Sequence, residues 1–462
     1  MLYCNWRCGP RPVWLKPPTK HYKFNSCLSS IYGLKAIFPY KNSMKIAVIG
    51  AGIIGVTTAY ELACDGHQVT VYEQRSAAAE VASFANAGVL APGYVTPWAA
   101  PGMPWKVAQQ LLAPHAAVRV GLPLSTADMA WMWRFWRACQ LETYITHRAA
   151  LQKLAFYSLE RLQAITDQHQ LDYDRAGGYM VLLRSDKDHA MVQPSLQVLR
   201  DLGVPFDQLD EATARTIEPA LNPDTHFYGA VHLPQDGVGN CRQFALMLKD
   251  TARSMGVDFQ FNTTVTQVNP AQAATLFIVS SLPHAAQTPQ PVHFDAVVLC
   301  AGTASAQLCQ PLGIKLPMAP VYGYSVSAHV REPLDAPRGA LMDEHYKVAI
   351  SRLGNRVRVA GSAELGGRPD ARSASALRTL YKVLQDWFPG AAVLGHGVQE
   401  WKGARPMLAD RPPMVGASGV PGVWLNTGHG SSGWALSCGS ARLLADAVQG
   451  EPAAIDAKPY LP

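Results

Sequence analysis

"MKIAVIGAGIIGVTTAYELACDGHQVTVYE" (residues 44–73) is the stretch that decides the fold of this 462-residue chain. Its first apolar run, 46–49, predicts a buried strand of a parallel sheet. Three glycines in the spacing G-x-G-x-x-G follow, and then a helical pattern that Gly66 is placed to end. A second predicted strand ends in Glu73. Glycines between a strand and a helix, with an acidic residue further on, are the context that a dinucleotide-binding fingerprint requires.

Each residue of the fingerprint has a physical role. Gly50 permits the tight turn, Gly52 lets a pyrophosphate approach the backbone, and Gly55 allows close packing of helix and strand. The first N–H groups of the helix face the phosphates. Glu73 is placed to accept hydrogen bonds from the adenosine ribose, so the stretch predicts an ADP-binding unit.

The charge of the chain is concentrated in its leader. Residues 1–43 carry seven of the 40 Lys and Arg residues and none of the 34 acidic ones, which leaves 33 basic against 34 acidic residues elsewhere. A nucleic-acid partner is therefore not expected for the folded part. The leader lacks the pattern of a secretory signal, and its prolines oppose an amphipathic transit helix. We expect a disordered leader or a misassigned start, with Met44 as the working start.

The cysteine pattern and the hydropathy exclude further classes. Nine cysteines are scattered, without a C-x-x-C pair or a Cys/His cluster of zinc spacing, so we expect reduced thiols, no metal site and a cytoplasmic location. The sequence contains no run of 18 apolar residues, so no transmembrane helix is predicted.

The segments outside the fingerprint favour FAD over a nicotinamide. Further βαβ repeats are missing after the fingerprint; instead 76–104 is rich in Ala, Gly and Pro, which suits an extended segment against a flat ring system but also an ordinary loop. "FDAVVLCAG" (294–302) predicts a parallel strand that reaches the cofactor. "WKGARPMLADRPPMVG" (401–416) leads to the strand "VWLNTG", and a glycine-rich turn then opens a helix over 429–450.

With these motifs the chain resembles the D-amino-acid oxidase superfamily of FAD-dependent oxidoreductases, most closely the bacterial D-amino acid dehydrogenase (small subunit) type, from Met44 to about Ile455. The resemblance rests on "SFANAGVLAPGYVTPWAAPGMP", "LPQDGVGNCRQF", "YGYSVS", "MDEHYKVAISRLGNRVRVAGSAE", "GARPMLADRPPMVG" and "LNTGHGSSGW". It implies oxidative deamination of D-amino acids, D-alanine included, by hydride transfer from Cα to flavin N5. The products are a 2-oxo acid and ammonia, and the electrons pass to a quinone or another respiratory-chain acceptor.

Two alternatives remain open. An oxidase of the same fold would use oxygen on glycine, sarcosine or another N-substituted amino acid. A non-catalytic flavin-bound subunit would only assemble with a partner. The family also implies peripheral contact with the inner membrane.

The resemblance places three residues at the active site. Arg405 in "GARP" is expected to bind the substrate carboxylate through its guanidinium fork, and Tyr346 to add a hydrogen bond to it. The alternatives are a structural ion pair of Arg405, for instance with Asp410, and a core position for Tyr346. His429 lies near the flavin and is as well explained by a positional role as by a catalytic one.

The remaining expected contacts are to the cofactor, which we expect to bind noncovalently in spite of the nearby Cys438. The residues expected to hold FAD are Ile49, Gly50, Gly52, Ile53, Ile54, Gly55, Glu73, Arg75, Ser83, Asn86, Ala87, Gly88, Val265, Ala301, Gly302, Gly403, Gly428, Gly430, Ser431 and Gly433.

The fold class predicted is α/β (α+β overall), with a Rossmann-like FAD-binding domain and a discontinuous substrate domain on a mixed or antiparallel sheet. The FAD-binding domain is assigned to 44–95, 203–308 and 400–450; the substrate domain to 96–202 and 309–399; and a C-terminal tail to 451–462. "MAWMWRFWRAC" (129–139) is favoured as a core helix, with a membrane or quinone contact as the alternative.

Overall fold

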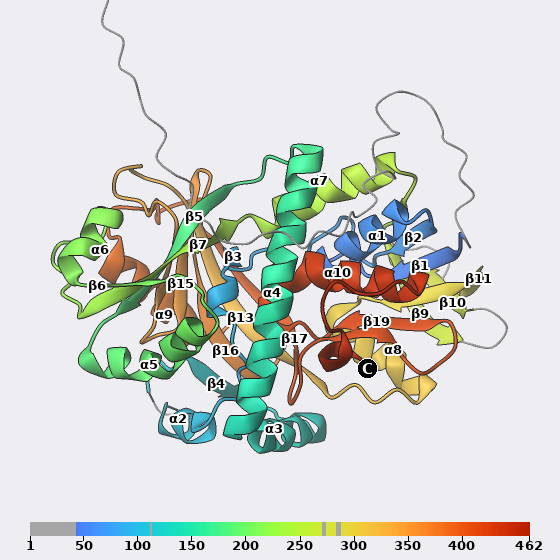
Figure 1. The fold of residues 1–462 in the computed structure, drawn as a ribbon, viewed down its shortest axis with the longest axis horizontal. Helices are drawn as coiled ribbons and strands as arrows, with labels where there is room; N and C mark the ends of the chain where they lie inside the picture. The colour runs from blue at the N-terminus through green and yellow to red at the C-terminus, as the bar shows by residue number, and fades with distance from the viewer. Residues whose placement is uncertain (1–42, 111–112, 270–273, 283–287) are drawn as a thin grey trace, which may run out of the picture. The chain divides into compact units, whose positions relative to one another are not determined.

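A computed structural model describes residues 43–110, 113–269, 274–282 and 288–462. Except for Ser43, the predicted leader lies outside the described residues. The body of the chain, from Asn42 to Pro462, is one compact unit built around two sheets. In the view of Figure 1 the six-stranded sheet lies to the right of the long helix α4, and most of the ten-stranded sheet lies to its left.

The six-stranded sheet is the dinucleotide-binding unit that the opening stretch predicts. Its strands, in spatial order, are β18 (Met414–Ala417), β19 (Val423–Thr427), β12 (Ala296–Leu299), β1 (Lys45–Ile49), β2 (Gln68–Tyr72) and β8 (Asp258–Gln260). All neighbours pair in parallel except β18 and β19. A small antiparallel sheet of β9 (Thr263–Asn269), β10 (Ala274–Ser280) and β11 (Gln290–Phe294) accompanies it.

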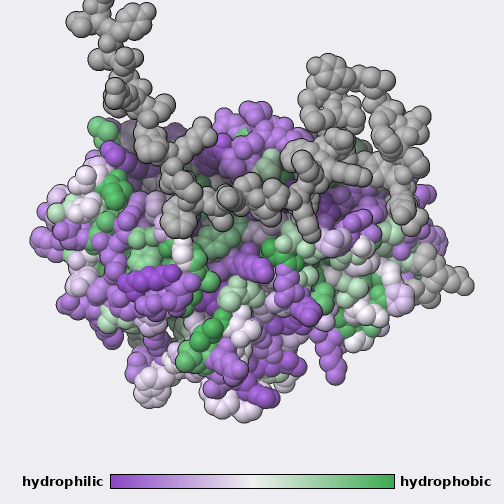
Figure 2. Space-filling model, viewed as in Figure 1, coloured by the Kyte–Doolittle hydropathy of each residue, from purple (hydrophilic) through white to green (hydrophobic). Residues whose placement is uncertain are grey.

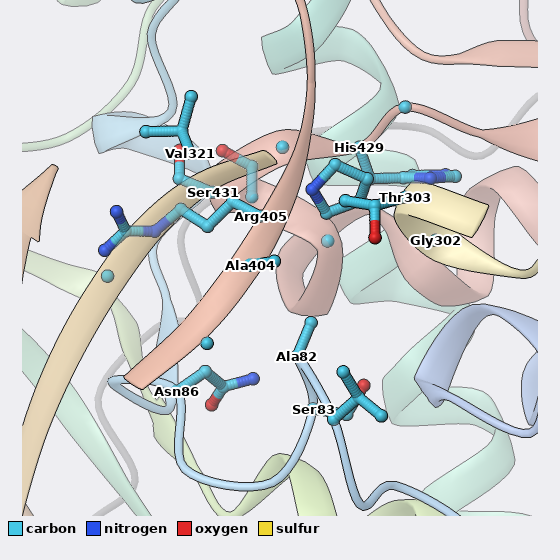
Figure 3. A pocket seen from close by; sticks show the side chains of 18 of the residues that line it. Ala82, Ser83, Asn86, Gly302, Thr303, Val321, Ala404, Arg405, His429 and Ser431 are labelled. Carbon is cyan, nitrogen blue, oxygen red and sulfur yellow. The ribbon is translucent and has the colours of Figure 1, made fainter. Parts of the chain in front are cut away.

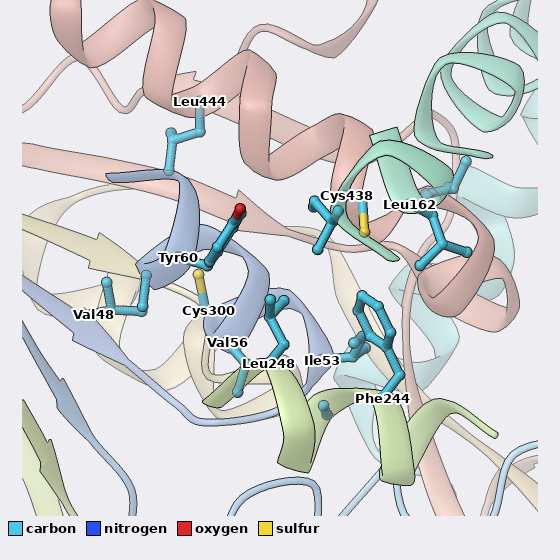
Figure 4. Close-up of a cluster of buried hydrophobic side chains, with 14 of the residues drawn as sticks. Val48, Ile53, Val56, Tyr60, Leu162, Phe244, Leu248, Cys300, Cys438 and Leu444 are labelled. Carbon is cyan, nitrogen blue, oxygen red and sulfur yellow. The ribbon is translucent and has the colours of Figure 1, made fainter. Parts of the chain in front are cut away.

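Four helices form the core beside this sheet. They are α1 (Ile53–Cys64), α4 (Leu141–His169), α7 (Cys241–Ser254) and α10 (Gly433–Gln449). Figure 4 shows their side chains meeting, with Tyr60 of α1, Phe244 of α7, Cys438 of α10 and Leu162 of α4 in one cluster. Nearly every residue of α1 is buried, because α7 and α10 both pack against it and β1 lies beneath it.

The ten-stranded sheet is mixed, as predicted. Its main path is β17 (Gln399–Leu408), β13 (Met318–His329), β16 (Arg356–Gly366), β15 (Val348–Leu353), β14 (Ala340–Asp343), β5 (Arg175–Leu183), β7 (Gly229–Gly239) and β3 (Val89–Leu90). Off this path β4 (Val118–Gly121) pairs with β16, and β6 (Asp207–Leu209) with β7. The accompanying helices are α2 (Met103–Gln110), α3 (Thr126–Ala138), α5 (Asp186–Asp201), α6 (Glu211–Ile217) and α9 (Ala374–Trp387), while the short helix α8 (Ser305–Cys309) contacts β9 of the small sheet.

The predicted segment boundaries need correction, although the two-sheet architecture is as expected. Strands β3, β6, β7 and β17 fall in segments assigned to the FAD-binding domain, yet all four pair within the ten-stranded sheet. Helix α4, assigned to the substrate domain, packs against α10 of the nucleotide-binding unit. The tail at 451–462 is also part of the core, because Tyr460 is buried and its hydroxyl donates to the Ala150 carbonyl at 2.7 Å. Alternation predicts a strand but not its partner, which explains these errors.

The tryptophan-rich helix α3 is not a core helix, so the favoured interpretation of 129–139 is wrong. Trp131 is buried and its indole N–H donates to the Met407 carbonyl at 2.9 Å. Met129, Trp133 and Trp136 are 59%, 59% and 52% exposed. On the face seen in Figure 2 hydrophobic residues occur in small groups, and pale side chains lie among hydrophilic ones at the lower edge, where Figure 1 places α2 and α3. Among the described residues, none of the helices is long and apolar enough to cross a membrane.

Gly55 provides a direct test of the strand–helix junction. A Cβ atom at this position would lie 1.8 Å from the Gly50 carbonyl oxygen, so Gly55→Ala must displace backbone. We expect a loss of about 3 kcal/mol in the free energy of unfolding, measured by urea titration. Gly395→Ala is the matched control, because no atom lies within 4 Å of a Cβ there. Equal stability of the two variants would contradict this account of the junction.

Candidate active site

A cavity of about 1030 Å³ lies where the two sheets face each other. From the nucleotide-binding unit it is lined by the residues that follow the carboxyl ends of β1, β12 and β19, which is where open α/β sheets bind ligands. From the other side it is lined by β13, β16 and β17 of the ten-stranded sheet. Figure 3 shows His429 and Thr303 on one wall, Arg405 and Val321 on another, and Ser83 and Asn86 below them.

The glycine turn after β1 has the geometry that the fingerprint predicts. Gly50 has a φ of +101°, which favours glycine, and its N–H donates to the Tyr72 carbonyl at 2.8 Å. Ser83 comes from a distant loop, and its hydroxyl accepts a hydrogen bond from the Ile53 N–H at 3.0 Å. The Glu73 carboxylate accepts from the Ala51 N–H at 2.8 Å and so stands directly beside the turn.

Most of the predicted cofactor residues meet at this cavity. The ones that line it are Ile49, Gly50, Gly52, Ile53, Ile54, Glu73, Ser83, Asn86, Ala87, Val265, Ala301, Gly302, Gly403, Gly428, Gly430, Ser431 and Gly433. Gly55, Arg75 and Gly88 are not among the lining residues. Gly55 acts at the helix–strand contact, the exposed Arg75 donates its backbone N–H to Glu73, and Gly88 pairs with Gly239 of β7.

The described residues fit an FAD molecule. A Cβ atom on Gly52 would have only the Ser83 hydroxyl within 4 Å, and one on Gly302 would have no neighbour, although both residues line the cavity. Gly52 and Gly302 therefore leave open space where the backbone borders the cavity, which gives a bound FAD room to contact the backbone directly. Cys438 is fully buried in α10 and is not a lining residue, which agrees with noncovalent binding.

Arg405 lies on β17 with its guanidinium in the cavity wall (Figure 3). Its Nη1 donates to the Ser362 carbonyl at 2.8 Å, and among the described residues it forms no ion pair. Asp410, the alternative partner, pairs instead with Arg134 at 3.3 Å. Burial lowers the pKa of Arg405 to about 10, so it is charged at neutral pH and able to bind a carboxylate.

Gly323 on β13 makes room for this guanidinium. Its cross-strand partner is Gly403, and a Cβ on Gly323 would lie 2.3 Å from Nη2 of Arg405. Trp98 adds a wall, with the Arg405 Cζ 5.6 Å from its ring centre and its indole N–H donating to the Ser431 hydroxyl at 2.9 Å. Neither Gly323 nor Trp98 is predicted from the sequence, because the quoted motifs contain both residues without showing which strand opposes Arg405.

The structure does not place Tyr346 at the substrate. It is not a lining residue, and it packs in the turn between β14 and β15 with Arg184 Cζ 5.0 Å and the His345 ring 4.8 Å from its own ring centre. The predicted role in carboxylate binding is therefore wrong, and the alternative of a packed tyrosine is the better description. The side chain is directed by the contacts of the turn, which the motif does not reveal.

His429 is a neutral residue in the cavity wall. It is 5% exposed, and its Nε2 lies 2.9 Å from the Ser440 hydroxyl of α10. Burial lowers the pKa of its imidazole to about 3, so it carries no charge at physiological pH. This geometry favours the positional role over a catalytic one.

The chain is similar to known proteins over most of its length. The model of the family described as FAD dependent oxidoreductase (DAO) matches residues 45–447. A D-amino acid dehydrogenase of Phenylobacterium zucineum is 39% identical over 90% of this chain and 96% of its own length. One from Vibrio cholerae serotype O1 is 37% identical over 88% and 95%.

Solved structures share the fold. A glycine oxidase from Geobacillus kaustophilus has a TM-score of 0.67 and 22% identity, covering 91% of this chain and 98% of its own. An iminodiacetate oxidase from Chelativorans sp. BNC1 has a TM-score of 0.67 and 20% identity, covering 90% and 98%.

The low pKa of His429 predicts a pH dependence of stability. Unfolding returns the imidazole to a pKa near 6.5, so the stability that this neutral group contributes is complete above pH 6.5 and is lost as the pH falls towards 3. Between pH 7 and pH 5 the wild-type chain should lose about 2 kcal/mol more than His429→Gln. Urea unfolding of both proteins at the two pH values measures the difference, and parallel losses would contradict it.

Proposed function

This chain belongs to the family of FAD dependent oxidoreductases, and we propose that within this family it is a D-amino acid dehydrogenase. It would convert D-amino acids, D-alanine among them, into 2-oxo acids and ammonia. The observation that carries the proposal is the buried, charged Arg405 without an ion-pair partner in the described residues, in the wall of the cofactor cavity. The names of relatives at 37–39% identity support the same activity.

The chain's own residues would bind and orient the substrate. When bound, FAD supplies the redox chemistry, accepting a hydride from the substrate Cα at N5. Arg405 would hold the carboxylate by two parallel hydrogen bonds and so fix the direction of the Cα–H bond. Its positive charge and the desolvation of the cavity both lower the pKa of the substrate ammonium, which favours the neutral amine that the reaction needs.

The electron acceptor is proposed to be a quinone that reaches the protein at a membrane surface. The far end of the cavity is apolar, lined by Met103 and Val107 of α2, Val120 of β4, and Met132 and Trp136 of α3. Trp136 lines the cavity and is also half exposed, so the cavity extends to the surface of α3.

The surface around this end suits a peripheral contact with the inner membrane. Trp105 is 68% and Leu122 80% exposed, and Trp133 of α3 is exposed as well. Basic residues accompany them: Lys106, Arg134 and Arg137. Exposed indole rings with nearby cations are the combination that binds an anionic lipid interface.

Anaerobic mixing tests the proposed activity. The holoprotein is mixed with D-alanine or L-alanine and the flavin absorbance is followed. We expect bleaching by the D-form alone, with slow recovery in air and rapid recovery with a soluble quinone. Bleaching by glycine or sarcosine only, with hydrogen peroxide formed in air, would instead indicate the oxidase. No bleaching by any amino acid would indicate the non-catalytic subunit.

Substitution of Arg405 tests its role in the same assay. Arg405→Met should lower kcat/KM for D-alanine by roughly 100-fold, mainly through KM, because a charged hydrogen-bond pair contributes up to about 3 kcal/mol. The FAD content should be unchanged. Tyr346→Phe is the control, since the structure places Tyr346 outside the cavity lining, and its kinetics should stay within twofold of the wild type. The reverse order of effects would contradict the assignment.

Vesicle sedimentation tests the membrane contact. The double variant Trp105→Ser, Trp133→Ser should bind vesicles that contain phosphatidylglycerol roughly tenfold more weakly, since it loses two apolar side chains from the interface. Leu334→Ser is the matched control, because Leu334 is 84% exposed and lies outside α2 and α3. Equal binding of all three proteins would locate the contact elsewhere or exclude it.

A further inference from the structure

A row of three buried polar side chains crosses the ten-stranded sheet. Arg358 of β16 has Ser327 of β13 and Ser351 of β15 as its direct cross-strand partners. Residues directly opposite in antiparallel strands share one face of a sheet, so the three side chains stand side by side. Both serines are fully buried, and Arg358 is 9% exposed.

This row holds the backbone of the segment that lines the cofactor cavity. Arg358 Nε donates to the Ser327 hydroxyl at 2.8 Å, and Nη1 donates to the Asn86 carbonyl at 3.0 Å. The Ser351 hydroxyl donates to the Ala87 carbonyl at 2.7 Å. Two successive carbonyls therefore point into the sheet. Because C=O and N–H of a trans peptide point in opposite directions, the Ala87 N–H is directed away from Arg358.

Within the described ranges Arg358 forms no ion pair. Burial lowers the pKa of Arg358 to about 10, so it stays charged at neutral pH. The neighbouring cations Arg356 and Arg242 also lower this pKa, whereas the Asp174 carboxylate raises it. Of these cations, Arg242 lies with its Cζ 4.3 Å from the centre of the Phe84 ring in the same segment.

Burying the charge of Arg358 without an ion-pair partner costs free energy. A neutral side chain would be enough to donate to the Asn86 carbonyl, as Ser351 donates to that of Ala87. The cation must then act on something beyond that hydrogen bond. Asn86 and Ala87 both line the cavity, so an FAD molecule bound there would lie next to their peptide. Reduction of a flavin adds negative charge to its ring system, and a fixed positive charge behind a hydrogen-bond donor favours that state.

We propose that Arg358 is a positioning residue that polarises the Asn86–Ala87 peptide and thereby stabilises the reduced form of bound FAD. This role of Arg358 requires FAD binding and does not depend on which amino acid is oxidised. Ser351 has no such role, because it donates to the neighbouring carbonyl without carrying a charge.

The two-electron midpoint potential of the bound flavin, measured by equilibration with a reference dye, tests the proposal without any substrate. In Arg358→Met the ratio of reduced to oxidised flavin at a given potential should fall at least tenfold, about 30 mV for a two-electron couple. Sulfite, which adds to electron-poor flavins, should bind at least tenfold more weakly. Arg358→Lys keeps the charge and should restore both quantities to within threefold of the wild type.

Ser351→Ala is the matched control, since it removes a neutral donor to the adjacent carbonyl and should change both quantities less than threefold. Arg358→Gln keeps a hydrogen-bond donor for the Asn86 carbonyl but removes the charge. The flavin potential in this variant should fall as it does in Arg358→Met. Arg358→Gln therefore tests the proposal even if Arg358→Met does not fold. An unchanged potential in Arg358→Gln, or an equal shift in Ser351→Ala, would overturn the proposal. Because no amino acid enters the measurement, its outcome is independent of the proposed dehydrogenase activity.

Discussion

The contact on which the whole site depends is the one between Gly50 and Gly55, at the turn from β1 into α1. A Cβ on Gly55 would lie 1.8 Å from the Gly50 carbonyl oxygen, so the helix approaches its own strand as closely as backbone allows. This approach directs the first N–H groups of α1 into the space beyond the carboxyl ends of the parallel strands. The Ser83 hydroxyl and the Glu73 carboxylate then gather around the turn through hydrogen bonds to Ile53 and Ala51.

The second half of the site follows from the ten-stranded sheet, whose edge strand β17 presents Arg405 to the same space. The guanidinium needs the missing side chain of Gly323 on the neighbouring strand. Segment 83–88 is held between the two units, by Ile53 at one end and by Ser351 and Arg358 at the other. The cavity is thus formed by residues of both sheets and of the segment 83–88 between them. The chain passes between the two sheets several times, so residues far apart in sequence line one cavity.

The sequence predicts well what is local and poorly what depends on pairing. The glycine spacing predicts the turn after β1, and the family resemblance predicts most of the other residues that prove to line the cavity. The prediction of a mixed or antiparallel sheet in the substrate domain is likewise confirmed by the ten-stranded sheet. The sequence patterns do not show that β7 and β17 join the larger sheet, that α3 exposes Trp133 and Trp136, or that Tyr346 lies outside the cavity lining. Gly323 and Arg358 escape notice for the same reason, since their roles arise only from the strands opposite them.

The electrostatics of the cavity unite these features. Two buried arginines without ion-pair partners in the described structure approach it from different strands, and the histidine in its wall is kept neutral by burial. A low-dielectric enclosure with this balance favours anionic groups and disfavours cationic ones. Such an enclosure would attract a carboxylate, promote loss of a proton from an ammonium, and favour electrons on a bound flavin, as proposed above. The charge distribution thus acts in one direction on all three requirements of amino acid oxidation, although no side chain in it has to serve as a general base.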